Sequence, residues 1–121
     1  MSLDFENILG QMPEEFSTPL TVNEVLVTLR ARWGCSYDIQ LVERGRYLYL
    51  QIMWSYMEQQ SFPLDEQAYV NKVINIIEVV NRLGLASYVR QWLACLTQRP
   101  SVGRALTLRL KGDWRSEEFV L

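Results

Sequence analysis

Histidine is absent from this 121-residue sequence, which has only two cysteines and two lysines. Because histidine is the commonest general base in enzymes, its absence excludes Ser-His and Cys-His nucleophile pairs. Cys35 and Cys95 form no C-x-x-C pair and have no histidine to complete a zinc set. The phosphate-binding patterns G-x-G-x-x-G and G-x-x-x-x-G-K are also missing. The sequence therefore predicts neither a metal site nor a cofactor.

Long apolar runs and targeting signals are missing as well. The longest uncharged run, residues 47–57, is too short and too polar to span a bilayer. Residues 1–20 contain Asp4, Glu6, Glu14 and Glu15 but no Lys or Arg, so they resemble neither a signal peptide nor a transit peptide. We therefore expect a soluble, cytoplasmic protein without a membrane span.

The composition is that of one globular domain, with 49% hydrophobic and 21% charged residues. At this length a chain buries roughly two thirds of its unfolded surface, so it needs no disulfide or metal to fold. The net charge of −2 disfavours a protein dedicated to nucleic acid or anionic membranes. Because only Lys72 and Lys111 are lysines, ten of the 12 positive charges are arginines, which pair in a plane with carboxylate or phosphate.

Residues 47–54 are the stretch on which we expect the core to assemble, because apolar or aromatic residues occur on both alternating faces. One face carries Leu48, Leu50, Ile52 and Trp54, and the other carries Tyr47, Tyr49, Gln51 and Met53. This composition is typical of a central strand that is covered on both sides.

The residues before this strand predict a helix and a hairpin. Thr21 and Glu24 have the spacing of a capping box, and an apolar helical period follows as far as Gly34. Residues 36–42 alternate as a strand, and a glycine-containing turn at 43–46 joins them to the central strand.

The residues after the central strand predict two helices and a third strand. Asp65 can cap a long helix that Gly84 ends, and a second helix spans about 87–98. Residues 104–111 alternate as a strand with one solvated face. The predicted fold is therefore α+β in the order α-β-β-α-α-β, with a three-stranded, mainly antiparallel sheet covered by helices and residues 47–54 in its centre.

We expect an acidic N-terminal extension at 1–20, the domain at 21–111 and a C-terminal tail at 112–121. The extension contains one short apolar helical stripe, formed by Leu3, Phe5, Ile8, Leu9 and Met12. Three alternatives are open for this stripe: it docks on its own domain, it serves as a partner-binding peptide, or it frays without a function.

Carboxylates near aromatic segments leave acid-base chemistry open as an alternative. Burial of Asp38, Glu58 or Asp65 would raise the pKa of that group. Structural roles fit them better, since Asp65 can cap a helix and Asp38 can lie at a sheet edge. Glu58 and Gln59 fall in an irregular loop, where they can bind backbone groups or a ligand.

A second alternative concerns single-stranded RNA. Tyr47 and Tyr49 beside Arg44 and Arg46 resemble a base-stacking sheet with phosphate contacts. Because helices are expected to cover that face and the net charge is acidic, core packing is the favoured interpretation. We expect no nucleic-acid binding.

Three motifs resemble the signature of a small domain family of unknown function in cyanobacteria and plant chloroplasts. They are Trp33-Gly34-Cys35-Ser36-Tyr37-Asp38-Ile39-Gln40-Leu41, the run 47–54 with Tyr56, Glu58-Gln59 and Ser61-Phe62-Pro63-Leu64, and Arg99-Pro100 with Gly103-Arg104-Ala105. The likeness covers about 21–111. It implies a protein of an oxygenic phototroph and assigns no activity, so no catalytic residue follows from it. Because no transit peptide is visible, the chain looks like a bacterial member.

Eight polar or aromatic residues of these motifs are the candidate interaction or ligand site. We expect them to converge at one end of the sheet: Tyr37, Asp38, Gln40, Tyr56, Glu58, Gln59, Arg99 and Arg104. The favoured function is a non-enzymatic protein-interaction or assembly module with an unidentified protein partner. The alternatives are a small-molecule binder or enzyme using Glu58 or Asp38 in an aromatic pocket, and the weak RNA binder.

Overall fold

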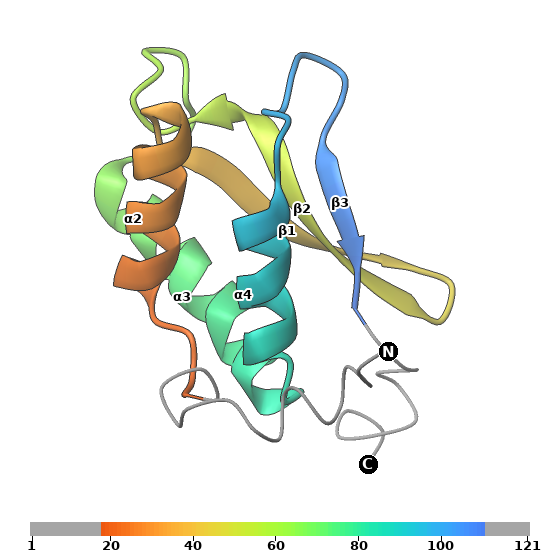
Figure 1. Ribbon diagram of the computed structural model, residues 1–121. Helices are drawn as coiled ribbons and strands as arrows, with labels where there is room; N and C mark the ends of the chain where they lie inside the picture. The colour runs from red at the N-terminus through yellow and green to blue at the C-terminus, as the bar shows by residue number, and fades with distance from the viewer. Residues whose placement is uncertain (1–17, 111–121) are drawn as a thin grey trace.

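The computed structural model describes residues 18–110 (Figure 1). The elements follow in the order α2 (Val22–Trp33), β1 (Tyr37–Arg44), β2 (Tyr47–Tyr56), α3 (Glu66–Arg82), α4 (Ala86–Cys95) and β3 (Leu106–Arg109). The predicted α+β class and element order are confirmed. The apolar stripe predicted within residues 3–12 and the tail at 112–121 lie outside the described residues.

The starts of α2 and α3 and the end of α2 form where the sequence predicts them. The helix predicted at about 87–98 instead ends at Cys95, because Leu96 is already extended, with a ψ of 130°. The Thr21 hydroxyl accepts the N–H of Glu24 at 3.1 Å at the start of α2, and the Asp65 carboxylate accepts the N–H of Ala68 at 2.7 Å at the start of α3. Gly34 follows α2 with a φ of 79°, in the left-handed region that glycine adopts without steric cost. These local signals fix the two helices before any tertiary contact is considered.

The sheet is antiparallel with the strand order β1-β2-β3, so the predicted central strand lies in the centre. A two-residue turn, Gly45-Arg46, joins β1 to β2. Gly45 has a φ of 61°, as the first position of a type II′ turn requires, and the twist of such a turn matches that of the strands. The hairpin tip therefore fixes the register of the two strands.

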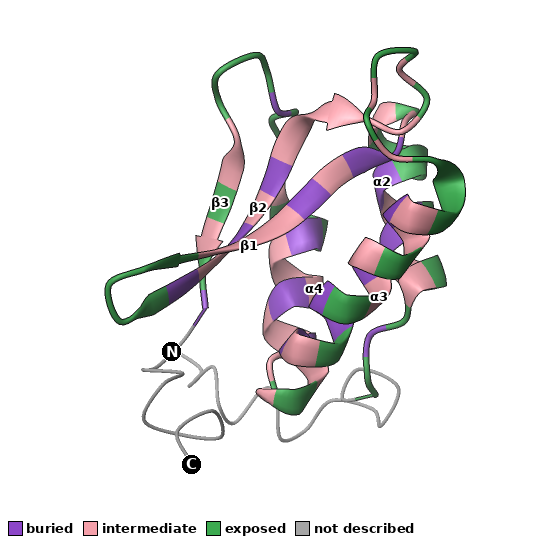
Figure 2. Cartoon of the chain, turned by 180° about the vertical axis from the view of Figure 1, so that it is seen from behind, coloured by how far each residue is buried: buried purple, intermediate pink, exposed green. Residues whose placement is uncertain are grey.

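Helices cover one face of the sheet. In Figure 1 all three described helices lie in front of the strands, and in the opposite view of Figure 2 the strands lie in front of the helices. Leu48, Leu50 and Ile52 point toward the helices and are only 7%, 4% and 1% exposed. The alternating residues of β2, from Tyr47 to Met53, are half-buried or exposed. The expectation that helices cover both faces is therefore wrong for the described residues.

An irregularity near the end of β2 displaces Trp54 from its predicted place in the core. Tyr37 pairs with Tyr56 and Ile39 with Ile52, so a step of two residues along β1 corresponds to a step of four residues along β2. The extra residues break the alternation that would have placed Trp54 beside Ile52 on the helix side. Trp54 is half-buried and lies outside the hydrophobic core.

The third strand is shorter than predicted. β3 pairs with β2 from Leu106 to Arg109, whereas the prediction began at residue 104. Arg104 belongs instead to a tight turn, in which its N–H donates to the Ser101 carbonyl at 2.7 Å. The alternation of apolar and polar residues thus begins before Leu106, the first residue of β3 that pairs with β2.

The described chain begins with a segment that is part of the packed domain. Leu20 is 3% exposed, and the Asn81 side chain of α3 binds both its N–H, at 2.8 Å, and its carbonyl, at 3.0 Å. None of the helices within 18–110 is both long and apolar enough to cross a membrane.

Candidate functional site

A group of interacting polar and aromatic side chains lies at one end of the sheet. The C-terminal ends of α2 and α4, the start of β1 and the end of β2 meet there, opposite the hairpin tip (Figure 1). We call the residues of this region the sheet-end cluster: Arg30, Arg32, Trp33, Ser36, Tyr37, Tyr56, Glu58, Thr97 and Arg99.

Tyr37 lies at the centre of the cluster and is 4% exposed. Its ring contacts Trp33 and Tyr56 edge to face, with centroids 5.6 and 5.9 Å apart, an arrangement that aromatic pairs favour. The Tyr37 hydroxyl accepts a hydrogen bond from Arg99 Nε at 3.2 Å, and its carbonyl accepts one from the Tyr69 hydroxyl at 2.8 Å. Burial raises the pKa of Tyr37, and a hydrogen bond with Cys35 raises it further, so the phenol stays neutral.

Ser36 and Glu58 form the polar half of the cluster. The fully buried Ser36 donates its N–H to Glu58 Oε1 and its hydroxyl to Oε2, both at 2.8 Å, and accepts from Arg30 Nε at 2.7 Å. Burial works to raise the pKa of Glu58, but the two hydrogen bonds from Ser36, a hydrogen bond from the Glu58 backbone and the charge of Arg30 together hold the pKa below its ordinary value. Glu58 is therefore an anion that the chain itself binds, and it pins the loop after β2 to the start of β1.

The second candidate carboxylate is also bound within the chain. Both oxygens of Asp38 accept hydrogen bonds from Lys72 Nζ of α3 at 3.0 Å. The Asp38 and Lys72 side chains are 14% and 33% exposed, so the pair is partly shielded from water. The contact ties the edge strand β1 to the helical layer, which is a structural role.

Two arginines cap the helices crosswise. Arg32 near the end of α2 donates Nη2–H to the Ala94 carbonyl at 3.1 Å and Nη1–H to the Leu96 carbonyl, both at the end of α4. Arg99, beyond α4, donates Nη2–H to the Trp33 carbonyl, the last of α2, at 3.2 Å. Each cation thus satisfies carbonyls that a helix C-terminus leaves without partners.

A groove of about 450 Å³ opens beside these caps and is lined by Arg32, Trp33, Thr97 and Arg99. A second groove, of about 440 Å³, continues along α2 from Arg32 and is lined by Val27, Thr28 and Ala31 as well. Neither arginine pairs with a carboxylate among residues 18–110. The sheet-end cluster therefore presents positive charge beside a half-buried tryptophan.

The structure brings together four of the eight predicted site residues: Tyr37, Tyr56, Glu58 and Arg99. Asp38 lies next to Tyr37 in the chain but contacts Lys72. Gln59 is linked to its loop by backbone hydrogen bonds, and Arg104 is exposed in its turn. Gln40 lies on the open face of the sheet, where its amide donates to Gln51 Oε1 at 2.9 Å.

Five members of the cluster were not among the predicted site residues: Arg30, Arg32, Trp33, Ser36 and Thr97. For the arginines a signal existed, because they lie in the last turn of the predicted α2, where cations favour helix carbonyls. Their partners are 6 and more than 60 residues away, so spacing alone does not identify them. Ser36 lies within the motif, but its burial depends on the tertiary fold.

The open face of the sheet carries a row of linked side chains. Gln40, Gln51 and Thr107 lie across the three strands, and Gln51 Nε2 donates to the Thr107 hydroxyl at 3.2 Å. Beside this row, the Arg109 guanidinium lies 4.6 Å from the centre of the Tyr47 ring, a cation–π contact. Within the described chain, the side chains on this face are thus stabilised by hydrogen bonds with one another, and no helix packs on them.

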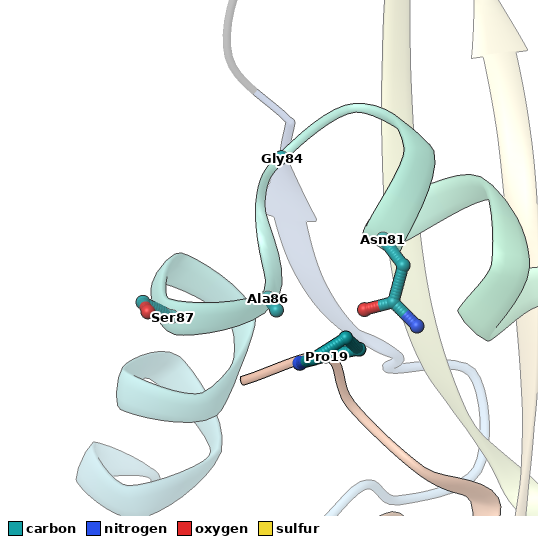
Figure 3. A pocket seen from close by; sticks show the side chains of 5 residues that line it. All are labelled: Pro19, Asn81, Gly84, Ala86 and Ser87. Atoms are coloured by element: carbon teal, nitrogen blue, oxygen red, sulfur yellow. The ribbon is translucent and has the colours of Figure 1, made fainter. Parts of the chain in front are cut away.

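A third hollow lies at the other end of the helices. It has a volume of about 220 Å³ and is lined by Pro19, Asn81, Gly84, Ala86 and Ser87 (Figure 3). The Asn81 amide is already bound to Leu20, so the hollow's central polar group serves the fold. Within residues 18–110, no three His, Cys, Asp or Glu side chains are grouped to hold a metal ion.

Comparison with known proteins identifies the family. The model of a domain of unknown function, DUF3067, matches residues 23–120. The chain belongs to this family. The DUF3067 match extends past residue 111, where the sequence resemblance was expected to end, into the C-terminal residues.

A solution NMR structure of the Alr2454 protein from Nostoc sp. strain PCC 7120 is similar to this DUF3067 chain. The two share 31% sequence identity and superpose with a TM-score of 0.73, over 84% of this chain and 98% of that one. This relative agrees with the expected small family and its occurrence in cyanobacteria. Among curated proteins, none matches the chain significantly.

Proposed function

We propose that this DUF3067 chain is a non-enzymatic protein-interaction module that contacts its partner through the sheet-end cluster. The observation that carries the proposal is a contrast within the cluster. Its carboxylate, Glu58, is bound by Ser36, whereas Arg32 and Arg99 line a groove without a carboxylate partner in the described chain. Glu58 is exposed, not buried as the alternative function expected, but each of its oxygens already accepts a hydrogen bond from Ser36. The groups that line the groove are donors and an aromatic ring, which are suited to recognition.

The competing proposal, a small-molecule binder or enzyme with a buried carboxylate, has less support. A general acid or base must exchange a proton with its substrate, and its pKa is tuned toward neutrality for that purpose. The pKa of Glu58 is shifted the other way, and Asp38 is paired with Lys72. Neither carboxylate lines the two grooves or the third hollow described above.

The Nostoc relative supports a role in cyanobacteria, and we extend the proposal to an accessory or assembly function in oxygenic phototrophs. A cytoplasmic location stays a prediction from the sequence. Occurrence in chloroplasts also stays a prediction.

The test is affinity capture from a cyanobacterial extract with the full chain and two variants as bait. Thr97→Glu places a negative charge in the groove, and Arg44→Gln lowers the net charge by the same amount at the far hairpin tip. A protein that is enriched by the wild type and Arg44→Gln but lost with Thr97→Glu is then purified and titrated by calorimetry. A partner that binds all three baits equally contradicts the sheet-end surface. If no protein is enriched but a metabolite raises the melting temperature of the chain in a thermal-shift screen, the small-molecule alternative is favoured.

A further inference from the structure

Resting on the proposed function, we infer that the groove lined by Arg32, Trp33, Thr97 and Arg99 binds an acidic segment of the partner protein. Two carboxylates of that segment would pair with the two guanidinium groups, and an apolar side chain between them would pack on Trp33. The site therefore selects a peptide stretch that combines Asp or Glu with an apolar residue.

Both arginines have N–H donors that no group in the described chain accepts. A guanidinium group has five N–H donors in a fixed plane, and carboxylates bind two of them side by side. Arg32 uses two of its donors on the carbonyls at the end of α4. Arg99 uses two, on the Tyr37 hydroxyl and the Trp33 carbonyl. Within the described chain, three donors remain on each arginine for a ligand.

These arginines are also held in place before any ligand arrives. An arginine on a free surface loses rotamer entropy when it binds a ligand, and this loss weakens binding. Here the crosswise caps have already restricted both side chains. The groove therefore offers fixed positive groups, which favours binding over an equal number of mobile surface arginines.

The chain segments that form the groove contain basic residues and no acidic ones. Residues 25–37 contain Arg30 and Arg32 and no Asp or Glu, and residues 86–112 contain no acidic residue at all. The acidic member of the cluster, Glu58, is bound by Ser36 and lies near Arg30. A carboxylate entering the groove thus meets positive charge from both of the chain segments that form it.

The groove also has an apolar component. Trp33 is half-buried and packs against the core, so one part of its ring system is fixed while the groove reaches the other. The neighbouring groove along α2 includes Val27, which is 52% exposed, and Ala31. A peptide that leaves the arginines along α2 therefore meets apolar surface on which an apolar side chain can pack.

The experiment uses the full chain and fluorescein-labelled peptides. The probe contains Glu and Asp residues around one central Leu, and the control peptide has Gln and Asn at the acidic positions. We expect saturable binding of the probe by anisotropy, weakened by salt, and little binding of the control. Thr97→Glu should weaken probe binding by about tenfold or more through like-charge repulsion, whereas Arg44→Gln should leave it within about twofold. Because Thr97 is exposed and donates no described hydrogen bond, Thr97→Glu is expected to fold, and circular dichroism checks this.

A second variant tests the arginines themselves. Arg99→Lys keeps the charge but removes the planar pair of donors, so probe affinity should fall while salt dependence remains. Equal binding of the probe by wild type and a folded Thr97→Glu overturns the inference. So does equal binding of the acidic and amide peptides, or displacement of the probe by single-stranded RNA at equimolar concentration. If no acidic peptide binds but a captured partner still depends on Thr97, the partner chemistry is wrong and the interaction module stands.

Discussion

The two faces of the sheet are built from the same three strands but by different means. On the helix side, Leu50 and Ile52 of β2 are at most 4% exposed and contribute to the continuous core. On the open side, Gln51 takes part in a row of side-chain hydrogen bonds, and Tyr47 carries Arg109 over its ring. A strand rich in β-forming residues on both faces need not be buried on both, because aromatic and amide side chains also stabilise a solvated sheet through cross-strand pairs.

The largest expected effect contrasts neighbouring residues on the two faces. Ile52→Ala should lower the free energy of unfolding by about 2–5 kcal/mol, because it opens a cavity in the core. Gln51→Ala removes two cross-strand hydrogen bonds, one part-buried and one exposed, and should cost less than about 1 kcal/mol. Urea denaturation of both variants measures the difference. Equal losses would mean that the open face is packed in solution.

The next effect is on the melting temperature and concerns the segment before α2, which includes the buried Leu20. Deleting residues 1–17 should leave the melting temperature nearly unchanged if the extension serves only a partner. Deleting 1–20 also removes Leu20, whose full burial is worth about 1.5–3 kcal/mol, and its two bonds to Asn81. We therefore expect a lower melting temperature for the longer deletion alone, as calorimetry would show. A large loss already with the shorter deletion would place the extension within the folded domain.

A smaller effect on the free energy of unfolding is expected on acidification, and it concerns Glu58 in the sheet-end cluster. The folded-state pKa of Glu58 lies below its ordinary value of 4.5, so its stabilising contribution is complete above that value. The contribution is lost as the pH falls through the folded pKa. The stability difference between wild type and Glu58→Gln should therefore be largest at neutral pH and shrink below pH 4.5. A difference that grows on acidification would contradict the hydrogen-bonded anion.

The smallest effect is expected for nucleic acid on the open face. The helices leave Tyr47 and Tyr49 uncovered, which removes one reason for excluding RNA, but the charge argument remains. Three arginines, Arg44, Arg46 and Arg109, can neutralise about three phosphates, so we expect no complex tighter than about 100 µM at physiological salt. A micromolar, salt-sensitive complex with single-stranded RNA that Arg44→Ala with Arg46→Ala abolishes would reverse this conclusion.

Local chemistry explains which features were predictable from the sequence. Thr21 and Asp65 cap helices through bonds to residues three positions later, and Gly45 meets a local backbone requirement. One error in the candidate site was avoidable. Gln40 is three residues from Tyr37 on a strand with period two, so the two side chains leave opposite faces.

Other features depend on tertiary structure and have no local signal. Which face the helices cover follows from how α3 and α4 return across the sheet. The displacement of Trp54 follows from two extra residues in β2, which alternation alone does not reveal. The groove depends on two arginines that are distant in sequence. Arg32 of α2 binds a carbonyl at the end of α4, and Arg99, beyond α4, binds the last carbonyl of α2.

The crosswise caps of Arg32 and Arg99 also link the dynamics of two helix ends. Terminal turns normally fray independently, and their amides exchange with solvent through local opening. Here the last carbonyl of α2 is held from the segment after α4, and the end of α4 is held from α2. Opening of one end therefore releases a restraint on the other, so both should open as one cooperative unit. A ligand that bound either arginine would then slow hydrogen exchange at the ends of both helices, including the one it does not touch.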